Sequence, residues 1–478
     1  MAKISKDSDN GTDNVRKEKN PHPMLLMALV VLFCAVLTYV IPAGRFERVL
    51  DQTTGREVIV PGSFTFIEGE PVKPLELLRS VTLGMQNAGS VIFFLFIIGG
   101  MFAVLNGTGA SGIGIANILK LFKGREILLI PVMMLLFGAG SAFLGNFEEF
   151  LVFVPVILAC SITAGFDSLT AVGIIFMAAA AGYGGAVTNA FTVGLAQEIA
   201  GLPRFSGMTL RIVLFLVLEC ASITYVTVMA MMIKKKPETS CVYAYDLEYN
   251  IGKRIDVGNL PPVTGRQILA LVFFVIGMIW SVVGVINWGY YIDELSAVFL
   301  ATGVICGIAG GRKAGEICED FIKGCKDMLP PCIIIGLANA ALVLFKEANA
   351  LDTILYGMSM ALNHVTSKAL PVGMFIFHEI FNVAVPSGSA QAAATMPIMI
   401  PLARDNGITA QTAVLAFQLG DAFTNVLAPT GGEILAALAI CRIPFRKWVK
   451  YLFPLFLIWC VIAVGFLVYA AHAGYGPF

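Results

Sequence analysis

Residues 386–391, with the sequence PSGSAQ, and residues 145–149, with the sequence GNFEE, interrupt long apolar runs in the two halves of this chain. The segments that follow them also match. Each contains a proline between apolar residues, Pro155 or Pro397, and then a Thr-Ala-Val triplet, at 170–172 or 412–414. Paired interruptions at corresponding places in two halves are typical of the substrate site of a secondary transporter. The repeated break therefore predicts both the fold and the position of the site.

The composition is that of a membrane protein. Of the 478 residues, 57% are hydrophobic and only 13% are charged, which excludes an ordinary soluble domain. Many runs approach the roughly 20 apolar residues that cross a bilayer. The 48 glycines fit helices that pack closely or break inside a membrane. The sequence predicts an all-α polytopic membrane protein.

The apolar runs predict about nine transmembrane helices, two re-entrant hairpins and several interfacial helices. The nine spans are expected near 24–42, 88–108, 169–200, 207–233, 266–286, 295–311, 328–347, 410–440 and 447–471. Segments 126–165 and 369–404 are interpreted as hairpins, because their polar interruptions leave arms shorter than about 20 residues. Mixed charged and apolar positions predict short interfacial helices at 74–86, 112–122, 314–326 and 351–364.

Lysine and arginine positions predict the orientation of the chain. They are concentrated in 1–23, 110–125, 234–266, 312–326 and 441–450, which places the N-terminus inside and the C-terminus outside. The strongest anchors are Lys234-Lys235-Lys236 and Arg446-Lys447. The longest outer loop, about 44–73, is expected to form a small hairpin with its turn at Thr54-Gly55.

The layout predicts two units that enter the membrane with opposite orientation, the plan of an inverted repeat. Residues 1–23 are a cytoplasmic tail, and 24–233 are the first unit, with its hairpin at about 126–165. Residues 234–286 are a cytoplasmic linker and a connecting span. The second unit is 295–478, with its hairpin at about 369–404. A hairpin and two full spans have the same parity, so the charges do not distinguish them.

The two hairpin tips are candidate binding elements: the first tip is 145–149 and the second tip is 386–391. A tip rich in serine and glycine does not continue a helix easily, and it exposes backbone N–H groups, hydroxyls and helix termini. Such groups bind an anion, or a sodium ion through their oxygens. The alternative is an ordinary turn outside the membrane between two spans. The matching break in the other half favours the functional interpretation.

A second pair of breaks follows, at Thr188-Asn189 with Thr192 and at Thr424-Asn425 with Pro429-Thr430. Proline and glycine disrupt a helix, and asparagine and threonine then cap the half-helices or present oxygens to an ion. The alternative is polar contacts between packed helices. In the first copy, the sequence GYGG at 182–185 is also consistent with packing alone.

Several ionisable residues are expected at membrane depth, where they commonly line a pathway or a cation site. Glu148 and Glu149 are adjacent carboxylates that repel each other unless one holds a proton or a cation lies between them; the alternative is a tip in water. Asp421 precedes Thr424 by one turn, so the two share a helix face. His378 and Glu379 are adjacent, and the sequence allows two interpretations. They are a pair that exchanges a proton, or a structural ion pair or hydrogen bond.

Two further ionisable residues, Arg211 and Glu219, lie on one predicted span and are interpreted as interfacial or inter-helix contacts. The candidate substrate and ion site then consists of the polar residues of the tips and breaks. These are Asn146, Glu148, Glu149, Thr188, Asn189, Thr192, Ser387, Gly388, Ser389, Gln391, Asp421, Thr424, Asn425 and Thr430. A sodium ion is expected, if used, near Asn146, Asn189, Ser387 and Asn425. We expect no catalytic residue, cofactor or structural metal.

At these motifs the chain resembles the C4-dicarboxylate anaerobic carrier family, and within it the YfcC-like branch, grouped with basic amino-acid antiporters in the ion transporter superfamily. The resemblance rests on NFEE at 146–149, NAFT at 189–192, VPSGSAQ at 385–391 and QLGD at 418–421. One departure is Ala190, where the family pattern has proline. The resemblance implies a homodimer with a rigid scaffold and a mobile transport domain that works by an elevator motion.

The sequence thus predicts a secondary active transporter in the cytoplasmic membrane. The resemblance favours a C4-dicarboxylate or similar carboxylate, coupled to Na⁺ or H⁺. The alternative is a basic amino-acid antiporter of the arginine/ornithine type, because the charges expected near the site are acidic. A passive channel does not need paired hairpins of opposite topology. An intramembrane aspartyl protease needs two facing aspartates, and Leu419-Gly420-Asp421 lacks the leading glycine of that motif. The expected partners are the solute, a coupling ion, the lipid bilayer and a second copy of the chain, with no nucleic acid.

Overall fold

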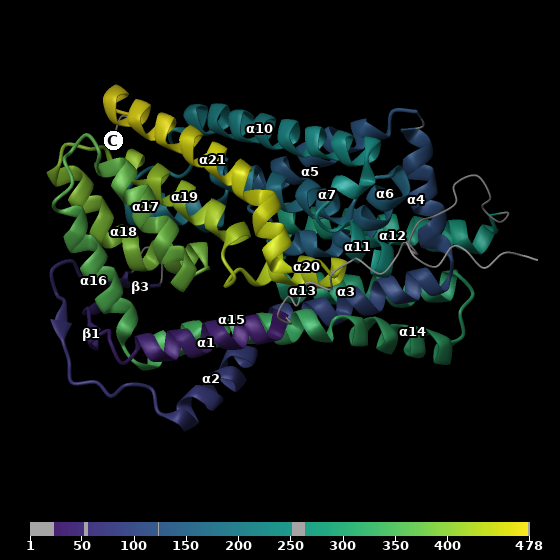
Figure 1. The fold of residues 1–478 in the computed structure, drawn as a ribbon, viewed down its shortest axis with the longest axis horizontal. Helices are drawn as coiled ribbons and strands as arrows, with labels where there is room; N and C mark the ends of the chain where they lie inside the picture. Colours follow the sequence, from purple (N-terminus) through teal and green to yellow (C-terminus); the bar gives the residue numbers. More distant parts are fainter. Residues whose placement is uncertain (1–22, 52–55, 123, 251–262, 477–478) are drawn as a thin grey trace, which may run out of the picture.

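The computed structural model describes residues 23–51, 56–122, 124–250 and 263–476 and is mostly helical (Figure 1). The predicted tail at 1–23 lies almost wholly outside the described residues, as do the turn at Thr54-Gly55 and part of the cytoplasmic linker. Within the described residues, nine helical segments are long and apolar enough to cross a membrane. The prediction of a polytopic helical protein is confirmed.

The first half contains helices of very different length. Their bounds are α1 Pro23–Leu37, α2 Pro74–Asn87, α3 Gly89–Gly107, α4 Ala110–Leu121, η1 Glu126–Leu128, α5 Leu129–Leu144, η2 Glu148–Phe153, α6 Val154–Ala164, α7 Ser168–Val172, η3 Gly173–Met177, α8 Ala178–Gly185, η4 Ala190–Gly194, α9 Leu195–Ile199 and α10 Met208–Lys235. The long α10 ends at Lys234 and Lys235, where positive side chains favour the C-terminal end of a helix.

The second half follows three short turns in the linker. These are η5 Pro237–Thr239, α11 Tyr243–Tyr245 and η6 Asp246–Asn250. The remaining helices are α12 Gly265–Trp288, α13 Ile292–Ala309, α14 Ala314–Asp327, α15 Leu329–Glu347, α16 Ala350–Leu362, α17 Leu370–Ala384, α18 Gly388–Asp405, α19 Ala410–Leu427, α20 Gly432–Cys441 and α21 Phe445–Ala473. Helices thus form at all four segments predicted to be interfacial, although their depth in a membrane stays a prediction.

The candidate spans differ from the predicted set in two places. The segment predicted at 24–42 is the shorter helix α1, and its described part is not among the nine. Conversely, Glu126–Leu144 is one of the nine, at 19 residues. The argument that both hairpin arms are too short to span is therefore wrong for this arm, because η1 extends α5 by a turn. The other eight predicted spans correspond to eight of the nine.

A small β-structure joins α1 to α2. Strands β2 (Arg48–Asp51) and β3 (Arg56–Ile59) pair antiparallel, and β1 (Gly44–Arg45) pairs with β4 (Thr65–Phe66). An ion pair of Arg48 with Asp352, with an N–O distance of 2.7 Å, ties these strands to α16. The predicted hairpin strands flank 52–55, as expected.

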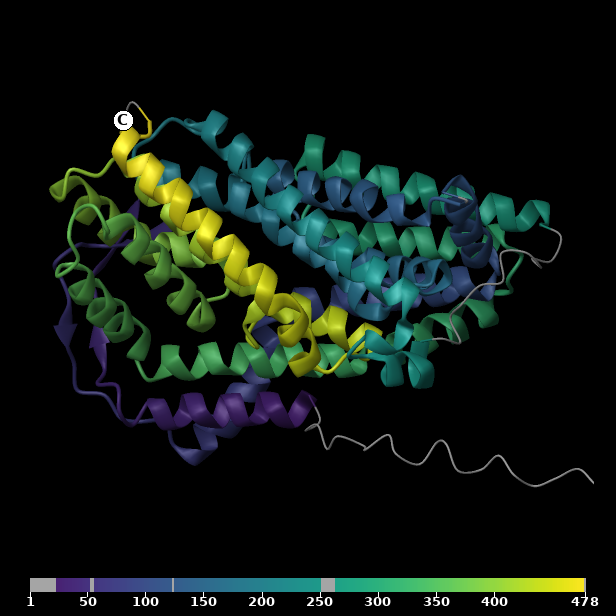
Figure 2. The same ribbon diagram turned by 45° about the horizontal axis from the view of Figure 1, so that its top comes forward.

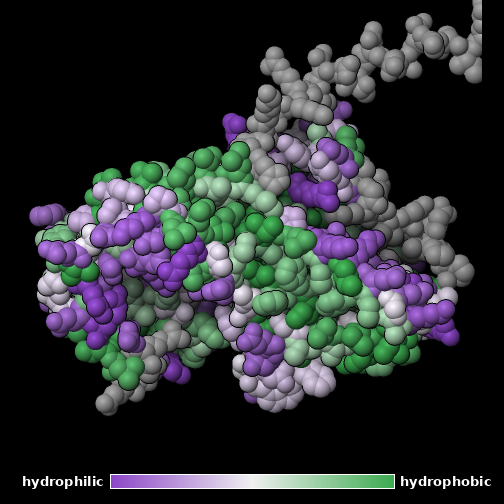
Figure 3. Space-filling view, turned by 90° about the horizontal axis from the view of Figure 1, so that it is seen from below, coloured by the Kyte–Doolittle hydropathy of each residue, from purple (hydrophilic) through white to green (hydrophobic). Residues whose placement is uncertain are grey.

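The helices form two connected groups (Figure 1, Figure 2). One group contains α3 with α13 and α14, α12 packed against α13, and α15 with α1 and α2. The other contains α5, α8, α10, α17, α18, α19 and α21, with α8 and α19 packed against each other and α10 and α21 along one side. Viewed from below, hydrophobic side chains cover broad areas, and hydrophilic residues gather in separate patches (Figure 3).

The two broken segments are among the most enclosed of the candidate spans. In the most apolar window of Ser168–Ile199 every residue is buried, and in that of Ala410–Cys441 67% are, whereas other windows fall as low as 24%. Irregular backbone at membrane depth is tolerated only where protein or a watery cavity satisfies its polar groups. The burial therefore explains why these two segments can break.

Candidate functional site

The first broken segment is interrupted between α8 and η4. Ala186 ends α8 in the left-handed region, with φ of 37°, which residues with a side chain rarely adopt. Asn189 then caps η4, because its Oδ1 accepts hydrogen bonds from the backbone N–H groups of Phe191 at 2.9 Å and Thr192 at 3.2 Å. Asn189 therefore has a capping role, as the sequence indicated.

The side chain of Arg211, on α10, caps the C-terminal end of α8. Its Nε and Nη2 donate to the carbonyl oxygens of Ala186 and Val187, both at 3.2 Å, and Nη1 donates to the carbonyl of Ser206 at 2.7 Å. The side chain is buried, with 1% exposed. A cation here offsets the partial negative charge at the C-terminal end of a helix. The interpretation of Arg211 as an inter-helix contact is confirmed.

The second broken segment is interrupted between α19 and α20, with neutral partners in place of an arginine. The indole Nε1 of Trp448 donates to the carbonyl of Val426 at 2.7 Å. Asn382 of α17 donates to the carbonyl of Asp421 at 2.8 Å and to Oδ1 of Asn425 at 2.9 Å. Sequence reasoning missed Asn382, since nothing in α17 alone indicates that it faces α19.

The two halves of the chain meet at Gly388, the first residue of α18 at the second tip. A Cβ atom placed there would collide with Oδ2 of Asp421, and it would lie 2.6 Å from Cγ2 of Thr192 and 3.0 Å from the hydroxyl of Tyr183. Only glycine permits this approach. The structure therefore brings together Gly388, Asp421 and Thr192, three of the predicted site residues. We call this meeting point, with Tyr183, the junction.

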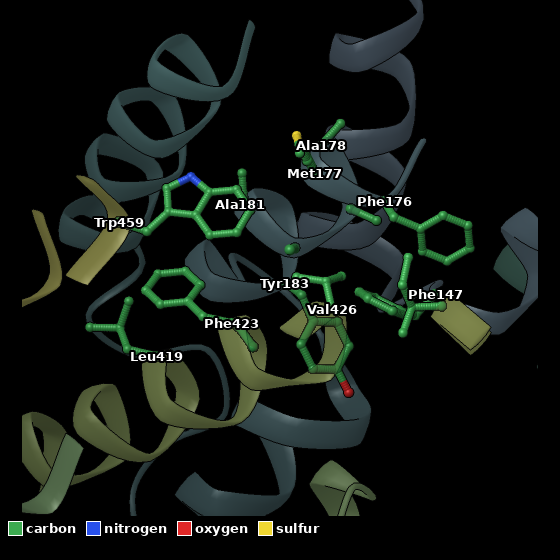
Figure 4. Close-up of a cluster of buried hydrophobic side chains, with 14 of the residues drawn as sticks. Phe147, Phe176, Met177, Ala178, Ala181, Tyr183, Leu419, Phe423, Val426 and Trp459 are labelled. Carbon is green, nitrogen blue, oxygen red and sulfur yellow. The ribbon is translucent and has the colours of Figure 1, made fainter. Parts of the chain in front are cut away.

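Tyr183 is a member of this junction that the sequence reading treated as packing. Its ring lies 5.4 Å from that of Phe147 at the first tip, and Gln418 of α19 donates to its backbone carbonyl at 2.8 Å. Figure 4 shows the ring between Phe147 and Val426, with the hydroxyl pointing out of the apolar cluster. Gln418 precedes Asp421 by three residues, and that helical spacing was the signal that it shares the face.

Four carboxylates surround the junction. Asp421 is fully buried, and it interacts electrostatically with Glu148. Glu433, in the first turn of α20, interacts with Glu148, Glu149 and Asp421. Glu148, Glu149 and Glu433 are half-buried, so solvent reaches them. Among the described residues, no lysine or arginine interacts with Glu148, Glu149 or Asp421.

A cavity of about 410 Å³ borders the first tip. Asn146 and Glu149 line it from the tip, and Ser281 of α12 and Phe299 of α13 line it from the other group of helices. Tyr291, which caps α13, interacts electrostatically with Glu148 and Glu149. The first tip therefore lies at the boundary between the two groups of helices.

Several buried polar atoms near the junction have no hydrogen-bond partner among the described residues. They are Asn189 Nδ2, Thr192 Oγ1, Asn382 Oδ1, Gln391 Oε1, Gln418 Oε1 and Thr430 Oγ1. Burying a polar group without a partner costs roughly 1–3 kcal/mol. Their concentration where two tips and two breaks meet indicates a place for water, an ion or a solute.

Other predicted site residues have local partners. Thr188 Oγ1 donates to the carbonyl of Phe143 at 2.8 Å. Gln391 Nε2 lies 3.1 Å from Nδ1 and 3.1 Å from the carbonyl oxygen of His378, so it joins the two arms of the second hairpin. Ser387 precedes α18 without a side-chain bond to its first turn. The neighbouring Ser389 is half-buried.

The dipeptide His378-Glu379 does not form a pair. His378 faces Gln391, whereas the carboxylate of Glu379 accepts a hydrogen bond from Oγ1 of Thr424 on α19. Consecutive residues of a helix point about 100° apart, so they serve different neighbours. The proton-pair reading of these two residues is wrong.

The oxygens expected to hold a sodium ion are in part already used by the protein. Asn189 Oδ1 accepts from Phe191 and Thr192, and Asn425 Oδ1 accepts from Asn382. Within the described ranges, no cluster of at least three His, Cys, Asp or Glu side chains has the arrangement of a metal site. A sodium ion near these residues stays a prediction.

The fold and the site define a multi-pass membrane protein whose two broken segments meet in the protein interior. Residues 21–472 match the family described as C4-dicarboxylate anaerobic carrier, DcuC, and the chain belongs to this family of membrane transporters. This confirms the resemblance recognised in the sequence motifs.

Two relatives extend this likeness. The chain is 30% identical over 498 residues to the Escherichia coli protein named "Putative basic amino acid antiporter YfcC", covering 96% of this chain and 98% of that one. It is also 30% identical over 417 residues to a Haemophilus influenzae protein, covering 86% and 80%. The solved YdaH transporter of Alcanivorax borkumensis is 15% identical, with a TM-score of 0.41, over 96% of this chain and 100% of that one.

Proposed function

We propose that this protein is a secondary active transporter that exchanges or accumulates a small organic solute carrying both a carboxylate and a cationic group, as a basic amino acid does. The observation that carries the proposal is the acidic junction of Asp421, Glu148 and Glu433, which no lysine or arginine offsets among the described residues. A solute cation between these carboxylates relieves their repulsion.

The second tip supplies the complementary group. The first-turn N–H groups of a helix have no partners within the helix, and the N-terminus of a helix attracts anions. Helix α18 begins at Gly388, directly beside Asp421 and Tyr183. A solute carboxylate at this N-terminus would place its cationic end toward the acidic residues. The two kinds of group in one junction match a zwitterion with an additional positive charge.

A C4-dicarboxylate or similar carboxylate is the second candidate, favoured by the family match over residues 21–472. It also fits the N-terminus of α18, but it brings a second negative charge to a junction that already holds four carboxylates. Such a solute needs H⁺ or Na⁺ to offset that charge. A requirement of counterflow itself for H⁺ or Na⁺, in the absence of any gradient, therefore distinguishes the two solutes.

For the transport movement we propose an elevator motion of an inverted-repeat transport domain in a homodimer within the cytoplasmic membrane, with the N-terminus inside. Support comes from the cavity of about 410 Å³ at the first tip, which lies between the two groups of helices. A cavity at this boundary suits a sliding movement of one group past the other.

The test is counterflow into proteoliposomes that contain the full chain. Arginine, ornithine and lysine are compared with C4-dicarboxylates, with and without sodium and a pH gradient. We expect saturable exchange of the basic amino acids, reduced at least tenfold in Asp421→Asn. Asp405→Asn, an exposed aspartate in the same half, is the matched control. Exchange of dicarboxylates alone would select the second candidate, and no exchange of any charged solute would reject the transporter function.

A further inference from the structure

Glu219, near the middle of α10, is a buried carboxyl group outside the junction just described. Its side chain is completely buried, and neither carboxylate oxygen has a hydrogen-bond partner among the described residues. Sequence reasoning interpreted Glu219 as an interfacial or inter-helix polar contact. It is not interfacial, because it lies inside the protein, but the inter-helix contact is confirmed, since its carboxyl group packs against Gly138 of α5.

The carboxyl group lies where three helices cross. A Cβ atom on Gly138 of α5 would lie 2.8 Å from Cδ and Oε2 and 3.0 Å from Oε1 of Glu219. A Cβ on Gly182 of α8 would collide with the backbone carbonyl of Gly138. Two glycines thus allow α5 and α8 to touch, and the absence of a side chain on Gly138 leaves the space that the carboxyl group fills.

Within the part of the chain that the structure describes, no charged group compensates Glu219. The titratable residues of the packed elements face elsewhere: Glu126 of η1 pairs with Lys234 at 3.2 Å, and the hydroxyl of Tyr183 faces Gly388. Arg211 binds the carbonyls of Ala186 and Val187, whereas Cys220 and Glu238 are exposed. On α21, Trp459 donates to Ser222 at 3.0 Å, and Cys460 interacts with Glu379.

An ionised carboxylate without partners in such a place costs several kcal/mol. In the packing seen here, Glu219 therefore holds its proton. Loss of that proton requires water or a cation to reach the carboxyl group, and this requires α5 to separate from α10. The protonation of Glu219 and the position of α5 are consequently linked.

Helix α5 connects this crossing to the first tip. Gly138 precedes Gly145, at the end of α5, by seven residues, which is about 10 Å along a helix axis. A Cβ on Gly145 would lie 2.6 Å from Oδ1 of Asn189, so the end of α5 touches the first break. The apolar side chains of Ala142, Val187 and Phe215 pack together near the end of α5. Because Gly138 and Gly145 lie on the same helix, movement of α5 would link the two places.

We propose that Glu219 is a proton-binding site of the transport cycle, occupied when α5, α8 and α10 are packed as seen here and emptied when α5 moves away from α10. The proposal rests on the transporter function proposed above and adds the coupling ion and its binding residue. Its ligand is H⁺, and the site is separate from the acidic junction that receives the solute.

The experiment compares wild type, Glu219→Gln and the exposed control Glu238→Gln in proteoliposomes. Glutamine keeps the size of the side chain but cannot exchange a proton. We expect Glu219→Gln to retain solute counterflow without a pH gradient and to lose at least tenfold of the accumulation driven by one. The proposal would be overturned if Glu219→Gln accumulated solute to the wild-type level. It would also be overturned if accumulation by the wild-type protein did not depend on the pH gradient.

Infrared spectroscopy provides a readout that does not need a known solute. The carbonyl band of protonated carboxylic acids should contain a component in wild type that is lost in Glu219→Gln, and this component should diminish on alkalisation of the folded protein. A band that never changes while the protein stays folded would make Glu219 a structural group. If wild type moves no solute, the proposed function fails, and the band still decides whether this site binds and releases a proton.

A second variant, Gly138→Ala, tests the proposal even if Glu219→Gln does not fold. Gly138→Ala keeps the carboxyl group but places a methyl group against it, and the flexible end of the glutamate has to move. We expect the infrared band to titrate at a different pH and the pH dependence of accumulation to shift with it. An unchanged band and an unchanged profile would contradict the role assigned to the α5–α10 contact.

Discussion

The two broken segments have the same pattern in the sequence but are stabilised differently in the structure. In the first, the cation of Arg211 binds the carbonyls of Ala186 and Val187 at the end of α8. In the second, the neutral indole of Trp448 binds the carbonyl of Val426 near the end of α19. The first break thus carries its own permanent positive charge, whereas a positive charge at the second has to come from a solute or an ion.

This difference assigns separate tasks to the two halves. The first break is fixed by charged hydrogen bonds, which are stronger than neutral ones. The second break contains Thr430, whose hydroxyl lacks a partner among the described residues, and adjoins the buried Asp421. We therefore expect changes at the first break to affect mainly folding, and changes at the second break and second tip to affect mainly transport.

The largest loss of stability against unfolding is expected for Arg211→Ala. Removal of the guanidinium leaves the carbonyls of Ala186 and Val187 without this donor, at a cost of about 1–3 kcal/mol for each. Arg211→Lys should be intermediate, because one ammonium group does not reproduce the planar set of donors. Thermal unfolding in detergent measures both. A thermal midpoint of Arg211→Ala equal to that of wild type would remove the basis of the comparison.

A smaller effect is expected for Trp448→Phe, which deletes the indole N–H and keeps an aromatic ring. The buried carbonyl of Val426 then lacks its donor, at a cost of about 1–3 kcal/mol. The matched control is Trp288→Phe, because Trp288 is 59% exposed at the end of α12. The same unfolding measurement applies. A fall in the thermal midpoint as large as that of Arg211→Ala would mean that the two hydrogen-bonding arrangements stabilise the protein equally.

The smallest change in free energy is expected for Gly388→Ala, although its consequence for transport is large. The added methyl group collides with Asp421 and approaches Tyr183. We expect at least a tenfold loss of counterflow, equivalent to about 1.4 kcal/mol, with little change in the thermal midpoint. Gly465→Ala is the control, since a Cβ there has no atom within 4 Å. Counterflow equal to wild type in Gly388→Ala would remove the second tip from the solute site.

Sequence patterns predicted the helices better than they predicted the contacts of the site. Breaks at 145–147, 186–189, 385–387 and 428–431 follow from glycine, proline and capping residues, whose effects are local. Tyr183 and Asn382 were missed because their roles depend on α19, far away in the chain. The short-arm argument also failed for Glu126–Leu144, since a 3₁₀ turn preceding α5 lengthens the arm.

The sequence by itself determined that this is a polytopic helical protein with two polar breaks in each half, because hydropathy and helix breaking depend on neighbouring residues alone. It also showed that carboxylates accompany the first tip and serines the second. Only the tertiary structure decided that Gly388, Asp421, Thr192 and Tyr183 meet, that Arg211 closes the first break, and that Glu219 is buried without a partner among the described residues. These facts depend on which helices pack together, and packing joins residues that lie far apart in the chain.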